Sequence, residues 1–130
     1  MIESAYAYIR VSTYTQVDGK SLDGQLEEIK QYCKAFNITL VDVYSDEGHS
    51  GKKIEGRPAF KKMLSDIDEK QEVDYVIVWK LSRFGRNACD SLNSLNYLQA
   101  RGVNLITLKE NLDNIHSDGK TGVYIVICLI

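Results

Sequence analysis

Residues 74–79 (DYVIVW) form a nearly continuous apolar run, and this run constrains the fold more than any other segment of the chain. Such a run is typical of a β-strand that is buried on both faces, because a solvent-facing side would place polar residues at every second position. Strands of this kind occur in parallel sheets that carry helices on both sides. The run therefore predicts the centre of an α/β sheet.

Other strand-like segments alternate with amphipathic helical segments along the chain. Strands are expected at residues 4–11, 38–44, 74–79 and 103–108, where apolar, aromatic and β-branched residues predominate. The β-α-β-α-β-α-β order predicts an open, mainly parallel sheet of about four strands in the order 2-1-3-4, with helices on both faces. A short further edge strand is compatible with this α/β arrangement.

Helical spacing of apolar residues predicts three helices between these strands. They begin near Ser21, at Pro58 and after Asn87, and Asn37 and Gly102 are expected to end the first and the third. Residues 46–57 and 80–86 are expected to be loops. The expected buried stripe of the first helix consists of Leu22, Leu26, Ile29, Cys33 and Phe36.

The chain has 130 residues and a net charge of −2, which fits one soluble domain with a single core. No global basic field draws such a chain to nucleic acid, so any bound anion must be held by a local arrangement. The three cysteines lie far apart without nearby histidines, so neither a disulfide framework nor a zinc site is expected, and a cytoplasmic location follows. No signal peptide is recognisable, and residues 123–130 (VYIVICLI) are too few to span a membrane.

Two basic segments are predicted to meet, because neighbouring parallel strands end at the same edge of a sheet. Arg10 and Ser12 lie at the end of the first strand, and Lys80, Arg83 and Arg86 follow the third strand without any acidic residue among them. Clustered guanidinium groups suit a phosphate, and they stabilise charge that builds up on a phosphodiester in a transition state. Ser12 beside these cations is then a candidate nucleophile toward phosphorus.

Each of these residues also has an ordinary structural interpretation. A serine at a strand end is commonly a loop or cap residue, and a basic loop is commonly just solvated. Tyr8 on a strand is typical of core packing, and Gln25 on the polar side of the first helix is typical of a solvent-facing residue. Residues 48–52 (GHSGK) lack the Walker spacing, and no Gly-x-Gly-x-x-Gly follows the first strand, so neither an ATP site nor a dinucleotide site is expected.

Several motifs in a fixed order resemble the catalytic domain of serine site-specific recombinases, the resolvase/invertase family. The motifs are residues 8–13 (YIRVST), 21–22 (SL) with 25–26 (QL), 44–51 (YSDEGHSG), 57–58 (RP) and 80–86 (KLSRFGR). Residues 44–58 are most similar to the large serine integrase and transposon recombinase branch. The resemblance runs from the first strand to the end of the chain, so residues 1–130 are expected to be one resolvase-like catalytic domain.

The resemblance implies site-specific DNA recombination without an energy cofactor or a metal. A serine attacks a backbone phosphate, releases a 3′-hydroxyl and forms a 5′-phosphoserine linkage, which the hydroxyl later attacks to rejoin the strand. The catalytic residues so implied are Ser12, Arg10, Arg83 and Arg86, with Tyr8 and Gln25 in supporting roles. Lys80 lies in the basic segment after the third strand, and it is expected to bind DNA phosphates together with Arg10, Arg83 and Arg86.

The resemblance also implies the partners. Double-stranded DNA recombination sites are expected, with homodimers or tetramers of the full-length protein and no membrane. A Gly-rich turn at residues 118–122 precedes a long oligomerisation helix in this family, so residues 123–130 are expected to begin that helix, although Val and Ile favour a strand. The rest of the helix and the DNA-binding domains are expected to lie outside this chain.

Ser82 is a departure from the family pattern, because resolvases commonly have an aspartate directly before the residue that corresponds to Arg83. A serine can hydrogen-bond but cannot form an ion pair with an arginine, which leaves open what orients Arg83 and what takes the Ser12 proton. A catalytically impaired DNA-assembly or regulatory module of the same fold is therefore an alternative to the enzyme. A second alternative is an unrelated doubly wound domain that binds a small phosphorylated ligand. The lack of a phosphate-binding glycine loop disfavours this alternative.

Overall fold

The computed structural model describes residues 3–11, 22–47, 57–85, 88–109 and 112–113. Strands and helices alternate along the chain as the sequence predicts. The strands are β1 (Glu3–Val11), β2 (Ile38–Glu47), β3 (Tyr75–Val78), β4 (Asn104–Thr107) and β5 (Leu112–Asp113). The helices are α1 (Leu22–Ala35), α2 (Pro58–Lys70) and α3 (Ala88–Ala100), with a short 3₁₀ helix, η1 (Leu81–Arg83).

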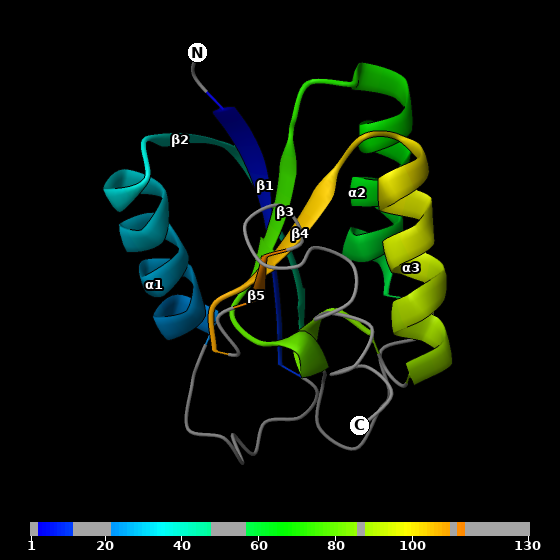
Figure 1. Cartoon of the computed structure of the whole chain (residues 1–130). Coiled ribbons are helices and arrows are strands. Elements are labelled where there is room, and N and C mark those ends of the chain that lie inside the picture. Colours follow the sequence, from blue (N-terminus) through cyan, green and yellow to red (C-terminus); the bar gives the residue numbers. More distant parts are fainter. Residues whose placement is uncertain (1–2, 12–21, 48–56, 86–87, 110–111, 114–130) are drawn as a thin grey trace.

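The strands form one sheet in the order β2-β1-β3-β4-β5. Strands β1 to β4 are parallel, and β5 pairs with β4 in the antiparallel direction. The predicted order 2-1-3-4 with a short edge strand is therefore confirmed. Because β1 pairs with β3, the segments that follow these two strands leave the sheet at its carboxyl edge, which is the lower edge in Figure 1.

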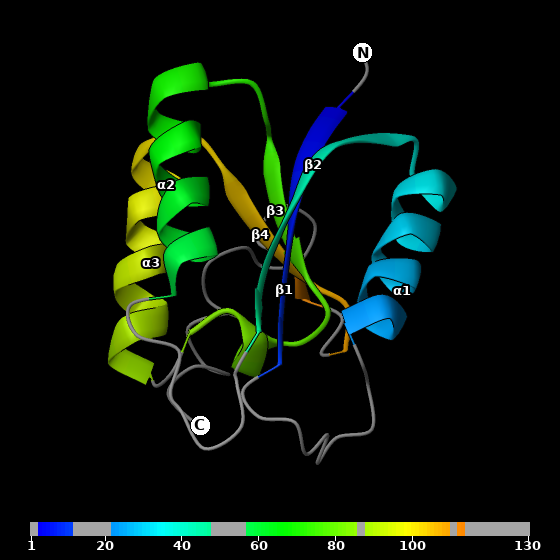
Figure 2. The ribbon, with the colours of Figure 1, turned by 180° about the vertical axis from the view of Figure 1, so that it is seen from behind.

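Alternate residues of β1 face opposite helical layers, as the pleat of a strand requires. Ala5, Ala7 and Ile9 belong to the core on the α1 side of the sheet, whereas Tyr6 and Tyr8 belong to the core on the side of α2 and α3. All four residues of β3 are buried, as its apolar run predicts. Figures 1 and 2 show α1 alone on one side of the sheet and α2 with α3 on the other.

Left-handed residues follow two of the helices at the positions where the sequence predicts helix ends. Asn37 follows α1 with a φ of 59°, and Gly102 follows α3 with a φ of 75°. Asparagine and glycine tolerate this conformation better than other residues, because a short polar side chain or a missing Cβ reduces the steric penalty. The two predicted helix ends are confirmed.

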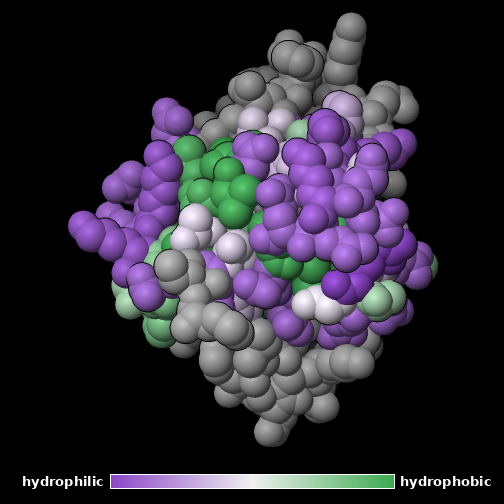
Figure 3. Space-filling model, turned by 90° about the horizontal axis from the view of Figure 1, so that it is seen from above, coloured by the Kyte–Doolittle hydropathy of each residue, from purple (hydrophilic) through white to green (hydrophobic). Residues whose placement is uncertain are grey.

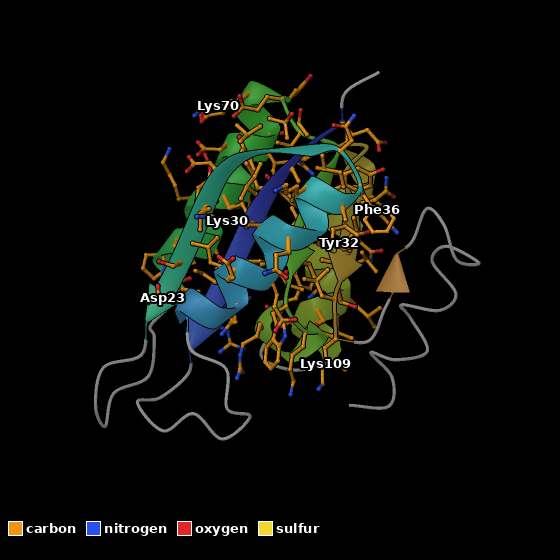
Figure 4. All side chains as sticks on the ribbon, turned by 90° about the vertical axis from the view of Figure 1, so that its left-hand side faces the viewer. Asp23, Lys30, Tyr32, Phe36, Lys70 and Lys109 are labelled. Carbon is orange, nitrogen blue, oxygen red and sulfur yellow. The ribbon has the colours of Figure 1, made fainter. Side chains whose placement is uncertain are left out.

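Phe36 differs from its predicted place. It is 63% exposed, so the prediction that it belongs to the buried stripe of the first helix is wrong. Phe36 lies just past the end of α1 at Ala35, and its N–H makes the last helical hydrogen bond, to the main-chain oxygen of Tyr32 at 3.0 Å. Its ring packs against Tyr32 instead, with ring centroids 4.6 Å apart, and Figure 4 labels this pair at the end of α1.

Two predicted loop segments contain regular structure. β2 continues to Glu47 instead of ending at Tyr44, because it stays paired with β1 as far as Val11. The segment of residues 80–86 contains η1, in which the N–H of Phe84 donates to the carbonyl oxygen of Leu81 at 2.9 Å. The basic segment after β3 therefore begins with a defined turn.

The edge strand β2 is irregular in its pairing with β1. Ala5 pairs with Leu40 and Tyr6 pairs with Asp42, so Val41 is an extra residue in β2. The backbone N–H of Val43 donates to the carboxylate of Asp42 at 2.8 Å. This arrangement has the two-against-one count of a β-bulge.

Seen from the amino edge of the sheet, most of the described surface is hydrophilic, with hydrophobic residues in limited areas (Figure 3). Apolar residues of the three helices pack in the two cores that flank the sheet. Residues 118–130, for which a turn and the start of a helix are predicted, lie outside the described residues.

Candidate functional site at the carboxyl edge of the sheet

Arg10 and Arg83 meet at the carboxyl edge although 73 residues separate them. Arg10 lies near the end of β1, and Arg83 ends η1, which follows β3. The Nε atom of Arg10 donates a hydrogen bond to the main-chain oxygen of Arg83 over 3.4 Å. The two basic segments that the strand order predicts to converge therefore do meet at these residues.

Arg10 is almost fully buried, with 8% of its surface exposed. Burial lowers the pKa of its guanidinium, the positive charges of Arg57 and Arg83 lower it further, and Tyr8 and Asp46 act in the opposite direction. A guanidinium stays charged at neutral pH even so. Arg57 and Arg83 therefore both lie close enough to Arg10 to repel its charge, and an anion bound beside Arg10 would offset this repulsion.

Gln25 holds the main chain of Arg10. Its Nε2 donates to the main-chain oxygen of Arg10 at 3.0 Å, and its Oε1 accepts the Arg10 N–H at 3.4 Å. Gln25 is fully buried, so the solvent-facing interpretation of this residue is wrong. Its position explains this, because Gln25, Ile29 and Cys33 recur every four residues on α1 and all three are buried.

Asp46, near the end of β2, connects Tyr8 to α2. Its carboxylate accepts the Tyr8 hydroxyl at 2.8 Å and the backbone N–H groups of Ala59 and Phe60 at 2.9 and 3.1 Å. The carboxylate thus caps α2, whose adjacent residue Arg57 makes no capping bond with its side chain. Burial and the bond to Asp46 raise the pKa of the fully buried Tyr8, so its hydroxyl is a protonated donor at neutral pH.

Arg57 belongs to the same site but is not among the site residues predicted from the sequence. It is 4% exposed, and its backbone is left-handed with a φ of 45°. Its guanidinium donates to the main-chain oxygen of Phe84 at 2.6 Å and to the carboxylate of Asp90 at 2.7 Å, and lies 4.0 Å from the ring centroid of Phe60. Since Phe84 directly follows Arg83, Arg57 ties the start of α2 to the segment that carries Arg83.

One signal in the sequence could have pointed to Asp46 and Arg57. Both lie in motifs of the resemblance, at the two ends of the segment between the second strand and the second helix. In a parallel sheet of order 2-1-3-4, this segment also starts at the carboxyl edge. The register confirms the neighbourhood, because Asp46 pairs with Arg10 across β2 and β1.

Lys80 is partly exposed and lies between β3 and η1, at the same edge. Of the other predicted site residues, Ser12 and Arg86 lie outside the described residues.

In the part of the chain that the structure describes, no group of His, Cys, Asp and Glu is arranged to hold a metal ion. None of the described helices combines the length and the apolar character that a membrane crossing needs.

Comparisons with known proteins match this architecture. The family model for the resolvase N-terminal domain matches residues 5–128. The DNA-invertase BinR of transposon Tn552 from Staphylococcus aureus is 34% identical over 106 residues, which are 81% of this chain and 47% of that protein. A resolvase from Clostridium perfringens is 30% identical over 112 residues, which are 85% of this chain and 52% of that protein. The chain thus spans about half the length of these relatives.

Solved structures are similar over nearly the whole chain. A resolvase family site-specific recombinase from Streptococcus pneumoniae superposes with a TM-score of 0.82 at 39% identity, covering 97% of this chain and 85% of that one. The N-terminal catalytic domain of TP901-1 integrase gives a TM-score of 0.81 at 30% identity, covering 98% of this chain and 93% of that one.

Proposed function

Because this chain belongs to the resolvase family of serine recombinases, we propose that it is the catalytic domain of an enzyme that cuts and rejoins DNA at specific sites. The observation that carries the proposal is the meeting of Arg10 with Arg83 at the carboxyl edge, where the Nε of Arg10 donates to the main-chain oxygen of Arg83 at 3.4 Å and the charges of Arg57 and Arg83 repel that of Arg10. A phosphodiester placed there offsets the repulsion, and it gains most when further charge develops on its oxygens.

The proposed nucleophile is Ser12. Its Oγ attacks the phosphorus of a backbone phosphate, the bond from phosphorus to the 3′ oxygen breaks, and that oxygen takes a proton and leaves as a 3′-hydroxyl. The serine gives up its own proton, and the 5′ phosphate becomes an ester of the serine. Attack by a 3′-hydroxyl on this ester reverses the step, so rejoining needs no ATP.

Chain geometry supports Ser12 in this role. Ser12 comes two residues after Arg10, and two residues of extended chain span at most about 7 Å. The main chain of Arg10 is itself fixed by two hydrogen bonds to Gln25. The proposed nucleophile is therefore attached to a held segment beside Arg10 and Arg83.

We assign phosphate binding to Arg10, Arg83, Arg86 and Lys80, and supporting roles to Tyr8 and Gln25. The hydroxyl of Tyr8 is a protonated donor that Asp46 already accepts, so Tyr8 orients neighbours rather than taking the serine proton.

The loop around Ser82 favours the enzyme over the catalytically impaired alternative. The main-chain oxygens of Arg83 and Phe84 accept hydrogen bonds from Arg10 and Arg57. These bonds hold the segment by its backbone, so its placement does not depend on a carboxylate at position 82. Double-stranded DNA is the proposed substrate, and the proposed active form is a homodimer or tetramer of the full-length protein.

Trapping of covalent protein–DNA adducts tests the proposal. The full-length protein is incubated with DNA that carries its recombination site, and adducts are compared for the parent, Ser12→Ala and Ser45→Ala. Ser45 is the matched control, because it is an exposed serine near the end of the neighbouring strand β2. We expect 5′-linked adducts from the parent and Ser45→Ala only. The proposal fails if the parent forms no such adduct or if Ser12→Ala still forms one.

A further inference from the structure

The positive carboxyl edge continues past Arg83 to a lysine that follows β4. Lys109 lies beyond the end of β4, and its backbone N–H donates to the main-chain oxygen of Trp79 at 2.7 Å. Its Nζ lies 6.0 Å from the ring centroid of Trp79, and the Nζ of Lys80 lies 5.7 Å from the same centroid. Two ammonium groups from adjacent strand ends therefore share one indole ring.

The surroundings of Lys109 suit an anion from outside the protein. Lys109 is exposed, and Figure 4 shows it at the lower edge, where the parallel strands end. Among the residues that the structure describes, no carboxylate pairs with its ammonium group. Contact with the indole limits the positions of both lysine stems, which reduces the entropy lost when they bind a ligand.

We propose that Lys109, together with Lys80, binds a backbone phosphate of the DNA beside the scissile phosphate. This inference rests on the proposed function. The strand order gives the spacing: β1, β3 and β4 are successive neighbours, adjacent strands lie about 4.8 Å apart, and so the ends of β1 and β4 lie about 10 Å apart. Successive phosphates of one strand rise about 3.4 Å along the duplex axis. A phosphate within about three nucleotides of the one at Arg10 is therefore in reach of Lys109.

The chemistry favours a phosphate over a base at this position. Trp79 is only 5% exposed, so its ring does not offer a free face on which a base could stack. What reaches the solvent is the exposed ammonium group of Lys109, which acts as a point charge and carries no information about base sequence. The contact therefore contributes to affinity equally for all DNA sequences.

Salt dependence of DNA binding tests the inference. Binding of the full-length protein to a duplex with its recombination site is measured across salt concentrations for the parent, Lys109→Gln, Lys109→Arg and Lys30→Gln. Lys30 is the matched control, because it is an exposed lysine on α1, which Figure 4 shows away from the carboxyl edge. We expect Lys109→Gln to reduce the magnitude of the slope of log K against log salt by about one. Lys109→Arg and Lys30→Gln should both keep the slope of the parent. An unchanged slope for Lys109→Gln overturns the inference.

Neutral phosphate analogues locate the contact. Single methylphosphonates are placed at each position within three nucleotides of the cleavage point, in the same strand. At one position the analogue should weaken binding of the parent but weaken Lys109→Gln no further. The inference is overturned if, at every position, the analogue weakens binding of Lys109→Gln as much as binding of the parent. It is also overturned if no analogue weakens binding of the parent, a result that points to a site for free phosphate.

Adduct formation at low salt keeps the two proposals apart. Suppose that the parent and Lys109→Gln both form adducts that require Ser12, and that their salt slopes are equal. The proposed phosphate contact of Lys109 then fails, while the proposed function stands. If the parent forms no adduct, the proposed function itself fails, whatever the slopes show.

Discussion

The guanidinium of Arg57 donates a 2.6 Å hydrogen bond to the main-chain oxygen of Phe84 and so joins the start of α2 to the segment that follows β3. It also pairs with the carboxylate of Asp90 at 2.7 Å, with 5% and 24% of the two side chains exposed. Both bonds are charge-assisted and largely shielded from water, which strengthens them. The backbone next to Arg83 is therefore held by a cation from another element.

Replacing Arg57 with methionine should lower the free energy of unfolding by about 2–3 kcal/mol, because the Phe84 oxygen and Asp90 lose a charged donor. Urea unfolding measures the loss. Arg101→Met is the matched control: Arg101 also lies over an aromatic ring and pairs with a carboxylate, Asp68, but in an exposed position. It should cost about 1 kcal/mol or less. Equal losses for the two variants would contradict the holding role of Arg57.

Gln25→Met should leave the N–H and the main-chain oxygen of Arg10 without their side-chain partner, at a cost of about 2 kcal/mol in unfolding free energy. If Gln25 positions Arg10, the adduct-forming rate of the folded protein should fall as well. Gln31→Met on the same helix is the control and should stay within about 0.5 kcal/mol of the parent, since Gln31 is exposed. If Gln25→Met is less stable but cleaves DNA at the rate of the parent, Gln25 does not position Arg10 for the reaction.

Gly85→Ala should destabilise the protein by about 2 kcal/mol or more, as expected for overpacking against a backbone. An added Cβ would lie 2.0 Å from the Oγ of Ser91 and 2.8 Å from its backbone nitrogen. Ser91→Ala should rescue the variant only partly, because it removes the hydroxyl but not the backbone contact.

Gly102→Ala is a useful comparison for this variant. Gly102 has open space around its Cβ position but a left-handed backbone, so its replacement should cost about 1 kcal/mol from conformation alone. Thermal or urea unfolding of both variants distinguishes close packing from backbone conformation. A smaller loss at position 85 than at position 102 would contradict the packing argument.

Alkaline pH should unfold the protein through its buried tyrosines. Burial, reinforced by hydrogen bonds to carboxylates, raises the pKa values of Tyr6, Tyr8 and Tyr44 above their ordinary value. Their contribution to stability is fully present below the unfolded pKa of about 10 and is lost as the pH rises from there toward the folded pKa values. Each such tyrosine contributes a slope of about 1.4 kcal/mol per pH unit in that window.

Urea midpoints between pH 8 and pH 11, followed together with tyrosinate absorbance, measure this loss. Tyr6→Phe should make the decline less steep, because it removes one of the raised pKa values. Ionisation of Tyr6, Tyr8 and Tyr44 while the protein remains folded would contradict the prediction.

The sheet order and the meeting of Arg10 with Arg83 could be predicted from the sequence, because both follow from one alternating pattern. A buried apolar strand flanked by helices leaves few topologies, and neighbouring parallel strands end at one edge. No contact between individual side chains is needed for that inference.

The roles of Asp46 and Arg57 could not be predicted in the same way. Asp46 caps α2 from strand β2, so its partners depend on the register of β2 and on where α2 begins relative to that strand. Gln25 and Phe36 show the same limit on α1. Whether each is buried depends on the rotation of the helix against the sheet and on its end at Ala35. Residue type alone predicts an exposed glutamine and a buried phenylalanine, whereas Gln25 is buried and Phe36 is exposed.

The interrupted pairing at Val41 has a consequence for self-association. β2 is a ten-residue strand at one edge of the sheet that the described strands form, and a long regular edge is a template on which another chain can add a strand. The extra residue breaks the regular row of donors and acceptors, and Asp42 takes the N–H of Val43 and adds an exposed charge. The bulge and the charge of Asp42 therefore make this edge a poorer template for the addition of another strand.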